Sequence, residues 1–506
     1  MELKYVKLYL LCIPVGILTG IVTIPYHYLL GKASDLRHLL FNSEVNWWMH
    51  LLAIFLMWVM GLIIHYGVKK CRSISGSGIP QVEGAIYGRF QINRPFKALV
   101  LKFTGGLASI GMGLSLGREG PSVQMGAFVA RIIGKWTHAS VSEQRYLYTG
   151  GASAGLSSAF IAPLASSIFI VEELEKFDSV KIIISSLLAS TIAGTMAGWA
   201  FPGNLYAPIN TSYPSELSIV GITLAFILFS LLLSLVGKLF NNCLLYFQQK
   251  YSQIQMSVYL KVLSVVIVTY IIGYFFSDLI AGGEDFLLKQ ADTTAYTGIL
   301  FLCGIILLKL LFTALSYSTG FPGGIFLPLL VIGGLTGKVF ALILIRQGFL
   351  SAEHCGFFMA IGMAAAFTAV VRSPVTGIIL LLEMTHKFEL LIPMTIVVGI
   401  TYFISDIAGV RPIYDQLYLR LLPKEKEDSN SRHTLSFEVN ADSYMQGKKI
   451  EDIILPKDCK IENVVREGTH LPLHNTVTQP KDRVDISLPS CELEKLYRTF
   501  RNMANE

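Results

Sequence analysis

Long apolar stretches, separated by short strings rich in glycine and proline, dominate the chain up to about residue 422. An apolar segment of about 20 residues is long enough to cross the hydrocarbon core of a bilayer as an α-helix. The stretches of this length are residues 5–30, 48–66, 180–200, 218–246, 258–280, 298–317 and 389–408. This pattern predicts an all-α polytopic membrane protein over residues 1–422.

The pattern changes after residue 422. Residues 423–433, PKEKEDSNSRH, form a polar segment of alternating charge, which is typical of a linker. Beyond it, apolar and polar residues alternate as in strands at 435–439, 459–468 and 482–488. A short helix is expected to begin near residue 446, and an amphipathic helix over 491–503. Residues 434–506 are therefore predicted to form a small α+β domain.

Composition supports the membrane assignment. Hydrophobic residues make up 53% of the chain and charged residues only 15%, whereas a soluble globular protein carries roughly 25% charged residues. The net charge of +6 is spread along the chain, with no nucleic-acid-binding arm. The seven cysteines show neither a CxxC pair nor metal-ligand spacing. Lys69, Lys70 and Arg72 after the second apolar stretch favour a cytoplasmic position for that loop.

The membrane part contains an internal repeat. Residues 117–121, GREGP, have a counterpart 207 positions later in 324–328, GIFLP. The segment that begins at Gly151 aligns with the one that begins at Gly362, 211 positions later. The nearly equal offsets indicate a duplication, with repeats over about 1–205 and 206–422. Repeats in membrane transporters are often inverted, and they bind substrate near the midplane on discontinuous helices.

Three glycine- and proline-rich strings, at 75–80, 117–121 and 320–328, each precede a new apolar helical stretch. Broken backbone is tolerated inside a bilayer only where protein buries it or where it lines a watery cavity. Each string therefore offers a helix N-terminus whose free N–H groups and positive dipole end attract an anion. Any one string alone would also fit a close-packing role for its glycines. The three together favour an anion site.

These strings resemble the signatures of the CLC family of chloride channels and chloride/proton antiporters. The family patterns GSGIP, GREGP and GxFxP correspond, in order, to residues 76–80, 117–121 and 324–328. The resemblance extends from about residue 10 to 420. It implies a homodimer in the cell membrane, in which each subunit has its own pore built from two inverted halves of tilted, broken helices. It also implies chloride as the transported ligand, protons as its partner, no cofactor and a cytoplasmic C-terminal domain.

The resemblance also assigns the chloride ligands. They are the Ser77 hydroxyl with the neighbouring Gly78, the backbone amides of Ile325 and Phe326, and the Tyr414 hydroxyl. A serine at position 77 favours chloride over nitrate or fluoride. Considered alone, Ser77 would also fit an N-cap that satisfies its own helix, and Tyr414 would fit an interfacial anchor.

Glu119 is the expected gating glutamate. A carboxylate at this depth costs about 3 kcal/mol or more to insert, so a functional reason is expected. In the family this side chain occupies an anion site when ionised and leaves it when protonated. A salt bridge to Arg118 is the alternative, although sequence neighbours on a helix rarely face each other.

Glu173 is the expected internal proton-transfer residue, because it occupies the position of the antiporters' proton-relaying glutamate. Channel members of the family usually have an uncharged residue there. The preceding Glu172 recurs as Glu383 in the second repeat, whereas Glu173 aligns with Met384. The repeated glutamate is therefore expected to be structural and the unmatched one specialised. The alternative is that both glutamates lie at a solvated helix end.

Four basic residues lie in otherwise apolar surroundings and are expected to raise the local potential for anions. They are Lys102, Arg118, Lys309 and Arg372.

The C-terminal domain resembles the TrkA-C (RCK-C) type of regulatory domain, on the motifs Gly447-Lys448, Arg466-Glu467-Gly468 and 481–484, KDRV. Domains of this type dimerise, and some bind small ligands, including cyclic dinucleotides. A dimer-stabilising cap without a ligand is the alternative.

The predicted function is secondary active exchange of chloride for protons. A passive voltage- or pH-gated chloride channel on the same fold is the alternative. A cation transporter would need carbonyl filters such as TVGYG or carboxylate rings, and the sequence has neither. No metal cluster, nucleophile elbow or phosphate loop supports an enzyme.

Overall fold

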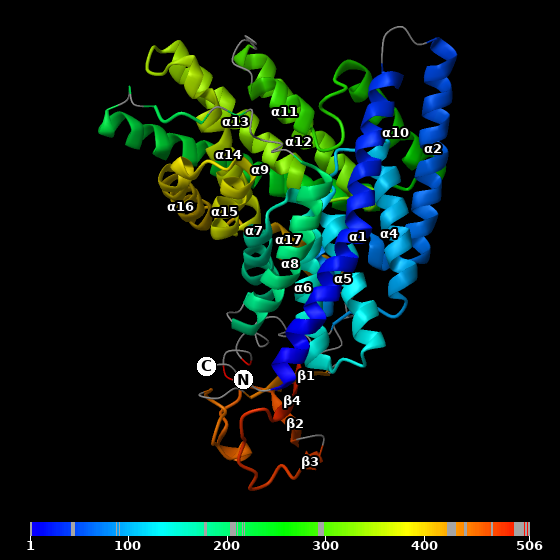
Figure 1. Ribbon diagram of the computed structural model, residues 1–506, viewed down its shortest axis with the longest axis vertical. Helices are drawn as coiled ribbons and strands as arrows, with labels where there is room; N and C mark the ends of the chain where they lie inside the picture. The colour runs from blue at the N-terminus through cyan, green and yellow to red at the C-terminus, as the bar shows by residue number, and fades with distance from the viewer. Residues whose placement is uncertain are drawn as a thin grey trace. The chain divides into compact units, whose positions relative to one another are not determined.

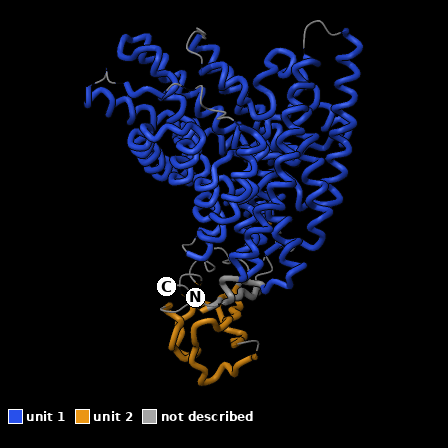
Figure 2. The backbone as a smooth tube through the Cα atoms, in the orientation of Figure 1, with its two compact units in different colours: residues 1–421 blue, residues 422–506 orange. Residues whose placement is uncertain are grey.

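The structure is a computed structural model, and it divides the chain into two compact units, residues 1–421 and 422–506 (Figure 2). It describes all residues except 1–2, 42–45, 88, 91, 177–179, 203–208, 210, 215, 217, 292–297, 423–431, 440–442, 467–468, 490–499, 501–502 and 504–506. Most of the linker predicted over 423–433 and most of the helix predicted over 491–503 lie outside the described residues.

The regular elements described in the first unit are all helices, joined by turns and loops (Figure 1). Its first half contains α1 (Leu3–Leu40), α2 (Trp47–Lys70), η1 (Arg72–Ile74), α3 (Ile79–Ile86), α4 (Pro95–Gly111), α5 (Glu119–Trp136), α6 (Val141–Phe160), α7 (Pro163–Phe169), η2 (Ile170–Glu175) and α8 (Val180–Ala200). Its second half contains α9 (Ile219–Gln253), α10 (Val258–Phe275), α11 (Glu284–Ala291), α12 (Ile299–Ser318), α13 (Phe326–Arg346), η3 (Ala352–His354), α14 (Cys355–Val371), α15 (Pro374–Thr385), η4 (Phe388–Leu390), α16 (Leu391–Ile407) and α17 (Ile413–Leu421).

Local sequence explains where several of these helices begin. Pro95, Pro163 and Pro374 open α4, α7 and α15, a position where proline loses no hydrogen bond and has the right φ in advance. Ser140 and Glu143 form a reciprocal capping box at the start of α6, with backbone-to-side-chain distances of 2.7 and 3.3 Å. These starts divide the apolar pattern into short tilted segments rather than uniform spans.

Nine helical segments among the described residues are long and apolar enough to cross a membrane. Seven of them correspond to the stretches predicted from the sequence. The other two are α13 and Ala352–Val371, whose apolar windows are 78% and 100% buried inside the protein. Both are rich in glycine or alanine and follow a break or a short turn, so sequence inspection did not single them out as spans. The prediction of a polytopic, mainly α-helical membrane protein is confirmed.

Small residues let paired helices approach closely, and they do so in the same way in both repeats. A Cβ atom on Gly126 would lie 1.9 Å from the carbonyl oxygen of Gly151, where α5 crosses α6. A Cβ atom on Gly333 would lie 2.5 Å from the carbonyl oxygen of Gly362, where α13 crosses α14. Gly126 and Gly333 are 207 positions apart, as are the two GxxxP strings. The duplication seen in the sequence is thus repeated in the helix packing.

The two repeats also contact each other reciprocally. Gly117 and Gly324 form an isolated antiparallel bridge, in which each backbone N–H donates to the other residue's carbonyl at 2.7 Å. Reciprocal contact between equivalent residues is the signature of a two-fold relation. This bridge joins the centres of the repeats through backbone atoms alone.

Glu172 and Glu383 make the second reciprocal contact. The Glu172 carboxylate accepts hydrogen bonds from Val375 N–H (3.2 Å) and Thr376 N–H (2.8 Å) at the start of α15. The Glu383 carboxylate accepts from Leu164 N–H (3.1 Å) and Ala165 N–H (2.8 Å) at the start of α7. Each repeat therefore caps a helix of the other, and the structural role expected for the repeated glutamate is confirmed.

The second unit is built on an antiparallel four-stranded sheet with strand order β1-β4-β2-β3. The strands are β1 (Arg432–Glu438), β2 (Lys460–Arg466), β3 (Thr469–Leu471) and β4 (Arg483–Pro489). The three predicted strands correspond to β1, β2 and β4, whereas β3 is too short to leave an alternating pattern. In place of the helix expected from about residue 446, the chain forms turns and the single 3₁₀ turn η5 (Ile450–Asp452). Val464, Val484 and Ile486 lie in the core of this unit.

Candidate anion and proton site

Three helices of the first unit begin where the sequence predicted breaks. α3 begins at Ile79 after Gly78, α5 begins at Glu119 after Arg118, and α13 begins at Phe326 after Ile325. Gly78 has a φ of +89°, a left-handed conformation that suits glycine. The first backbone N–H groups of a helix have no acceptor within the helix. Each break thus presents amide donors inside the protein.

Backbone hydrogen bonds hold the three broken segments together. Besides the Gly117–Gly324 bridge, Gly76 N–H donates to Gly320 O at 3.1 Å and Gly323 N–H donates to Gly76 O at 3.0 Å. The segment before α3 is therefore fixed directly to the segment before α13. The predicted strings from both repeats meet at one place.

Two buried lysines hold the loops in position. Lys102 donates from Nζ to the carbonyls of Ile74 (3.0 Å) and Gly76 (2.8 Å), immediately before Ser77. Lys309, 207 positions later, donates to two carbonyls of the loop before α11, those of residues 279 (2.7 Å) and 281 (2.8 Å). Both lysines are fully buried. Their ammonium groups bind backbone carbonyls, a loop-anchoring role that the sequence analysis did not foresee.

The other two basic residues pair with carboxylates. Arg118 forms an ion pair with Glu284 at 3.8 Å. Arg372 donates to Asp406 at 2.7 Å and to the carbonyl of Tyr402 at 2.6 Å. The alternative of a salt bridge between Arg118 and Glu119 is not realised.

Ser77 and Tyr414 are both fully buried. The Ser77 hydroxyl accepts a hydrogen bond from Ile79 N–H at 3.3 Å, but Gly78, and not Ser77, occupies the N-cap position of α3. Among the described residues, the Tyr414 hydroxyl has no hydrogen-bond partner. The alternative of an interfacial anchor for Tyr414 is therefore wrong. A buried phenol without a partner is costly, which points to an external acceptor for its proton.

Tyr317 is a site residue that the sequence analysis missed. It is buried, and a Cβ atom on Gly76 would lie 3.1 Å from its hydroxyl oxygen. The same hydroxyl interacts with Ser77. Its only local signal is its position at the end of α12, three residues before Gly320.

Aromatic rings enclose the site around Phe326. The Phe326 ring centroid lies 4.5 Å from that of Phe367, 5.1 Å from that of Phe160 and 5.9 Å from that of Phe169. The Phe169 ring in turn makes an edge contact with Tyr414 at 6.3 Å. This cluster surrounds the first amide groups of α13 with apolar side chains and keeps bulk water away from them.

Glu119 is fully buried at the first position of α5. Its carboxylate folds back over Gly117, where a Cβ atom would lie 2.1 Å from Oε2. Within the described part of the chain, neither carboxylate oxygen has a hydrogen-bond partner of normal geometry. The amide of Leu327, at the start of α13, is among the groups that act electrostatically on it. Glu119 therefore lies between the N-terminal ends of α5 and α13 and is not locked by a strong contact.

Glu173 is also buried, with 3% of its surface exposed, so the alternative of a solvated helix end is wrong for this residue. It lies on η2, a short π-helical segment that continues α7. One carboxylate oxygen accepts from the Ser373 hydroxyl at 2.9 Å, and the other has no partner among the described residues. Tyr414 lies within electrostatic reach of Tyr317, Glu173 and Glu119. Tyr414 is thus an electrostatic neighbour of both glutamates.

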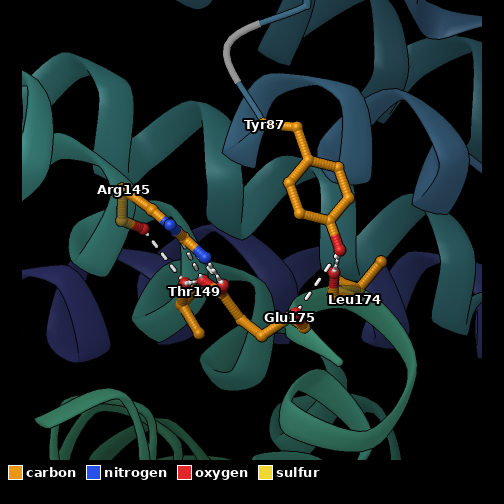
Figure 3. A network of polar contacts seen from close by, with 5 residues as sticks. All are labelled: Tyr87, Arg145, Thr149, Leu174 and Glu175. Carbon is orange, nitrogen blue, oxygen red and sulfur yellow. Dashed lines mark hydrogen bonds and ion pairs between the residues drawn. The ribbon is translucent and has the colours of Figure 1, made fainter. Parts of the chain in front are cut away.

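A polar network anchors the end of the segment that carries Glu173 (Figure 3). The buried Glu175 carboxylate accepts hydrogen bonds from Arg145 and, at 2.7 Å, from the Thr149 hydroxyl of α6. The Tyr87 hydroxyl donates to the carbonyl of Leu174 at 2.8 Å. These contacts fix the π-helical turn to α6 and α3. They hold the Glu173 backbone in place while its side chain keeps one free oxygen.

The fold and the site together define a multi-pass membrane protein in which three broken helices bring their N-termini together in the interior. The family profile described as "Voltage gated chloride channel" matches residues 59–406. The chain belongs to this family, the CLC family.

The similar curated proteins are named as exchangers. The chain is 32% identical over 427 residues to the H(+)/Cl(-) exchange transporter ClcA of Vibrio cholerae serotype O1 (strain M66-2), covering 81% of this chain and 89% of the relative. It is 30% identical over 440 residues to ClcA of Salmonella paratyphi B (strain ATCC BAA-1250 / SPB7), covering 83% and 89%.

Solved structures with the same fold include the X-ray structure of a slow cyanobacterial Cl⁻/H⁺ antiporter. The TM-score is 0.73, with 26% identity, 84% of this chain covered and 99% of that chain. A CLC-type fluoride/proton antiporter matches with a TM-score of 0.66 and 22% identity, covering 80% and 97%, which is a likeness of fold.

Proposed function

We propose that this protein exchanges chloride for protons across the membrane as a secondary active transporter. The observation that carries the proposal is the set formed by Glu119, Tyr414 and Glu173: two buried carboxylates and a buried hydroxyl, each with an unpartnered oxygen among the described residues. The names of the relatives, H(+)/Cl(-) exchange transporters, also favour antiport over passive conduction.

Chloride is proposed to bind between the helix N-termini. The ligands are the hydroxyls of Ser77 and Tyr414, the turn at Gly78 and the amides of Ile325 and Phe326. Hydroxyl and amide dipoles attract an anion without a full positive charge. Such a site binds weakly enough for the ion to leave, as transport requires. The two buried lysines leave this balance intact, because their charges are directed to backbone carbonyls.

Glu119 is proposed to be the gate. Its carboxylate resembles chloride in charge and in accepting hydrogen bonds, so the amides at the starts of α5 and α13 hold either one. Protonation removes the negative charge of Glu119. The amides at the starts of α5 and α13 then attract the side chain less, and it leaves the anion site. The lack of a strong competing contact at Glu119 supports this mobility.

Glu173 is proposed to deliver protons from the cytoplasmic side to Glu119. Proton transfer requires a group that binds and releases a proton, and the free oxygen of Glu173 supplies one. A passive chloride channel would need no such residue. It remains the second candidate, because the anion site by itself would serve a channel equally well.

The chain is also proposed to act as a homodimer with a regulatory C-terminal domain of the TrkA-C type. The antiparallel sheet of residues 432–489 supports an independent domain. Its expected ligand class is a small molecule such as a cyclic dinucleotide. Chloride flux of the full-length protein, measured with and without cyclic dinucleotides, tests this role. A flux that no such ligand changes would favour a C-terminal domain that stabilises the dimer without binding a ligand.

The decisive experiment is reconstitution of the full-length protein into liposomes with a chloride gradient. Chloride flux is expected to drive protons against their own gradient, and Glu119→Gln is expected to abolish proton movement because an amide cannot carry the proton. Wild-type protein that moves chloride with no linked protons would establish the channel reading. Intact coupling in Glu119→Gln would refute the role given to this residue.

A further inference from the structure

Three potential metal ligands lie together away from the anion site. Glu216 is in the connection between α8 and α9, and Glu353 and His354 are in η3, immediately before α14. The imidazole and the two carboxylates each offer a ligand atom, and these atoms all lie within 4.8 Å of one another. Neither the transport cycle nor the helix packing explains this convergence.

The histidine is buried, and its Nδ1 has two neighbouring oxygens of one residue. Only 5% of the His354 side chain is exposed. Its Nδ1 lies 2.9 Å from the carbonyl oxygen of Ser212 and 3.1 Å from the Ser212 hydroxyl oxygen. A carbonyl oxygen only accepts, so a hydrogen bond to it requires a hydrogen on Nδ1. In the neutral ring of that tautomer the lone pair is on Nε2.

Nε2 faces two carboxylates and makes no hydrogen bond with either. It lies 3.7 Å from Oε1 of Glu353 and 4.0 Å from Oε1 of Glu216. No other residue in the described part of the chain hydrogen-bonds to it. Three acceptors that face one another repel, and a cation bound among them removes that repulsion.

The distances favour a metal ion over a proton. A hydrogen bond between nitrogen and oxygen spans about 2.7–3.2 Å, which is shorter than either separation. Ligands at about 2.0–2.2 Å from a shared tetrahedral zinc ion lie about 3.3–3.6 Å apart. The separations of 3.7 and 4.0 Å are a few tenths of an ångström longer, and a small rotation of the two exposed glutamate side chains brings them into that range.

The outer contacts of the cluster are those of a metal centre. Metal-binding histidines usually donate their second N–H to a carbonyl or carboxylate, and ligating carboxylates are themselves hydrogen-bonded. His354 donates to Ser212 O, and Glu216 accepts from the backbone N–H of Ser351 at 2.9 Å and from its hydroxyl. Both Glu216 and Glu353 are exposed, with 44% and 63% of their side chains accessible, so an ion reaches them from solvent.

We propose that Glu216, Glu353 and His354 form a binding site for a divalent transition-metal ion, best suited to Zn²⁺. One imidazole nitrogen and two carboxylate oxygens make a three-ligand site, which leaves a fourth position for water. The ion joins the α8–α9 connection to the turn between α13 and α14. Because α13 begins at the proposed chloride amides, the ion fixes the far end of the helix that carries them.

The test uses full-length protein in detergent, stripped of metal with a chelator and titrated with ZnCl₂ by calorimetry. One Zn²⁺ per chain is expected to bind saturably, with a rise in thermal unfolding temperature because the ion binds the folded state. Glu216→Gln, Glu353→Gln and His354→Gln are each expected to weaken binding at least about tenfold, because loss of even an outer-shell partner of a metal site costs about 10–100-fold. Glu389→Gln, an exposed glutamate on η4, is the matched control and is expected to leave binding unchanged.

Two results would overturn the proposal. One is wild-type protein that binds no Zn²⁺ saturably; the other is binding that survives each of the three substitutions. Because His354 is buried, its substitution can also disturb folding. Glu216 and Glu353 are exposed, so their variants test the proposal even if the His354 variant does not fold.

Discussion

Glu172 and Glu173 are neighbours in the sequence with different surroundings. Both oxygens of Glu172 accept hydrogen bonds from the start of α15. Glu173 is buried with one oxygen free among the described residues. One carboxylate is committed to structure, and the other is available for a proton.

This contrast gives a matched pair of variants. Glu173→Gln is expected to abolish proton transport and to spare chloride flux, because the amide keeps the shape of the side chain but carries no exchangeable acid. Glu172→Gln is the control and is expected to retain coupling. Parallel recordings of chloride and proton flux in liposomes measure both, and loss of coupling in Glu172→Gln alone would reverse the assignment.

Tyr414→Phe tests the chloride ligand. A hydrogen bond to a charged group contributes about 1.5–3 kcal/mol, and about 1.4 kcal/mol corresponds to tenfold in affinity. Chloride binding is therefore expected to weaken by one to two orders of magnitude in calorimetry. Folding stability is expected to change little, because the hydroxyl has no partner among the described residues. Tyr246→Phe, at an exposed tyrosine, is the control; equal chloride affinities in the two variants would exclude Tyr414 as a ligand.

The sequence could locate residues that lie within a motif, and it missed those that reach the site from elsewhere. Glu119 and Ser77 were expected at helix breaks and are found there. Tyr317 and Ser373 contact the site from other segments, and no local pattern marks them. The anchoring role of Lys102 depends on which carbonyls the fold brings to its Nζ, and spacing does not encode this.

At the scale of elements, the exchanged caps of α7 and α15 are the most testable feature. Removal of a capping side chain costs about 1 kcal/mol, so Glu172→Gln and Glu383→Gln are each expected to lower the free energy of unfolding by about that amount. Unfolding of the purified protein in denaturant measures the change. Glu389→Gln is expected to have no effect, and an equal loss in that variant would show that the caps contribute nothing specific.

The π-helical form of η2 could not be predicted from the local sequence. Residues 170–175, IVEELE, have the composition of an ordinary α-helix. The contacts that hold this turn, from Glu175 to Arg145 and Thr149, involve another segment of the chain that the local sequence does not reveal. Such segments often occur at functional sites. Here the π-helical turn carries the residue proposed to relay protons.

At the scale of the whole molecule, the repeat and the change in composition near residue 423 predicted the main organisation. Both features extend over many residues, so they can be recognised even where the role of a single residue is misjudged. The reciprocal contacts between repeats could not be predicted, because the sequence shows that two segments are alike but not that they touch.

The C-terminal unit should respond to acid through Asp482. Burial alone would raise the pKa of Asp482, but hydrogen bonds from Arg466 (2.8 Å) and Gln479 N–H (2.8 Å), with the Arg466 charge, hold that pKa below its ordinary value. The stabilisation is therefore complete above the unfolded pKa, about 3.9, and is lost as the pH falls through the lower folded pKa.

Arg466→Met is expected to weaken protection of the β4 amides at pH 7, and the difference from wild type is expected to shrink as the pH falls through the lowered pKa of Asp482 and the carboxylate protonates. Hydrogen exchange of the full-length protein, corrected for the intrinsic effect of pH, measures this. Arg483→Met, which removes an exposed partner of Asp485, is the comparison. A difference that grows toward acid pH would contradict the sign.

The bridge between Gly117 and Gly324 and the exchanged glutamate caps have an evolutionary consequence. Contacts of this reciprocal kind are those that two identical, separate chains would make on meeting. Fusion of two copies of one ancestral chain would produce these contacts, and each half supplies the acid that completes one helix of the other.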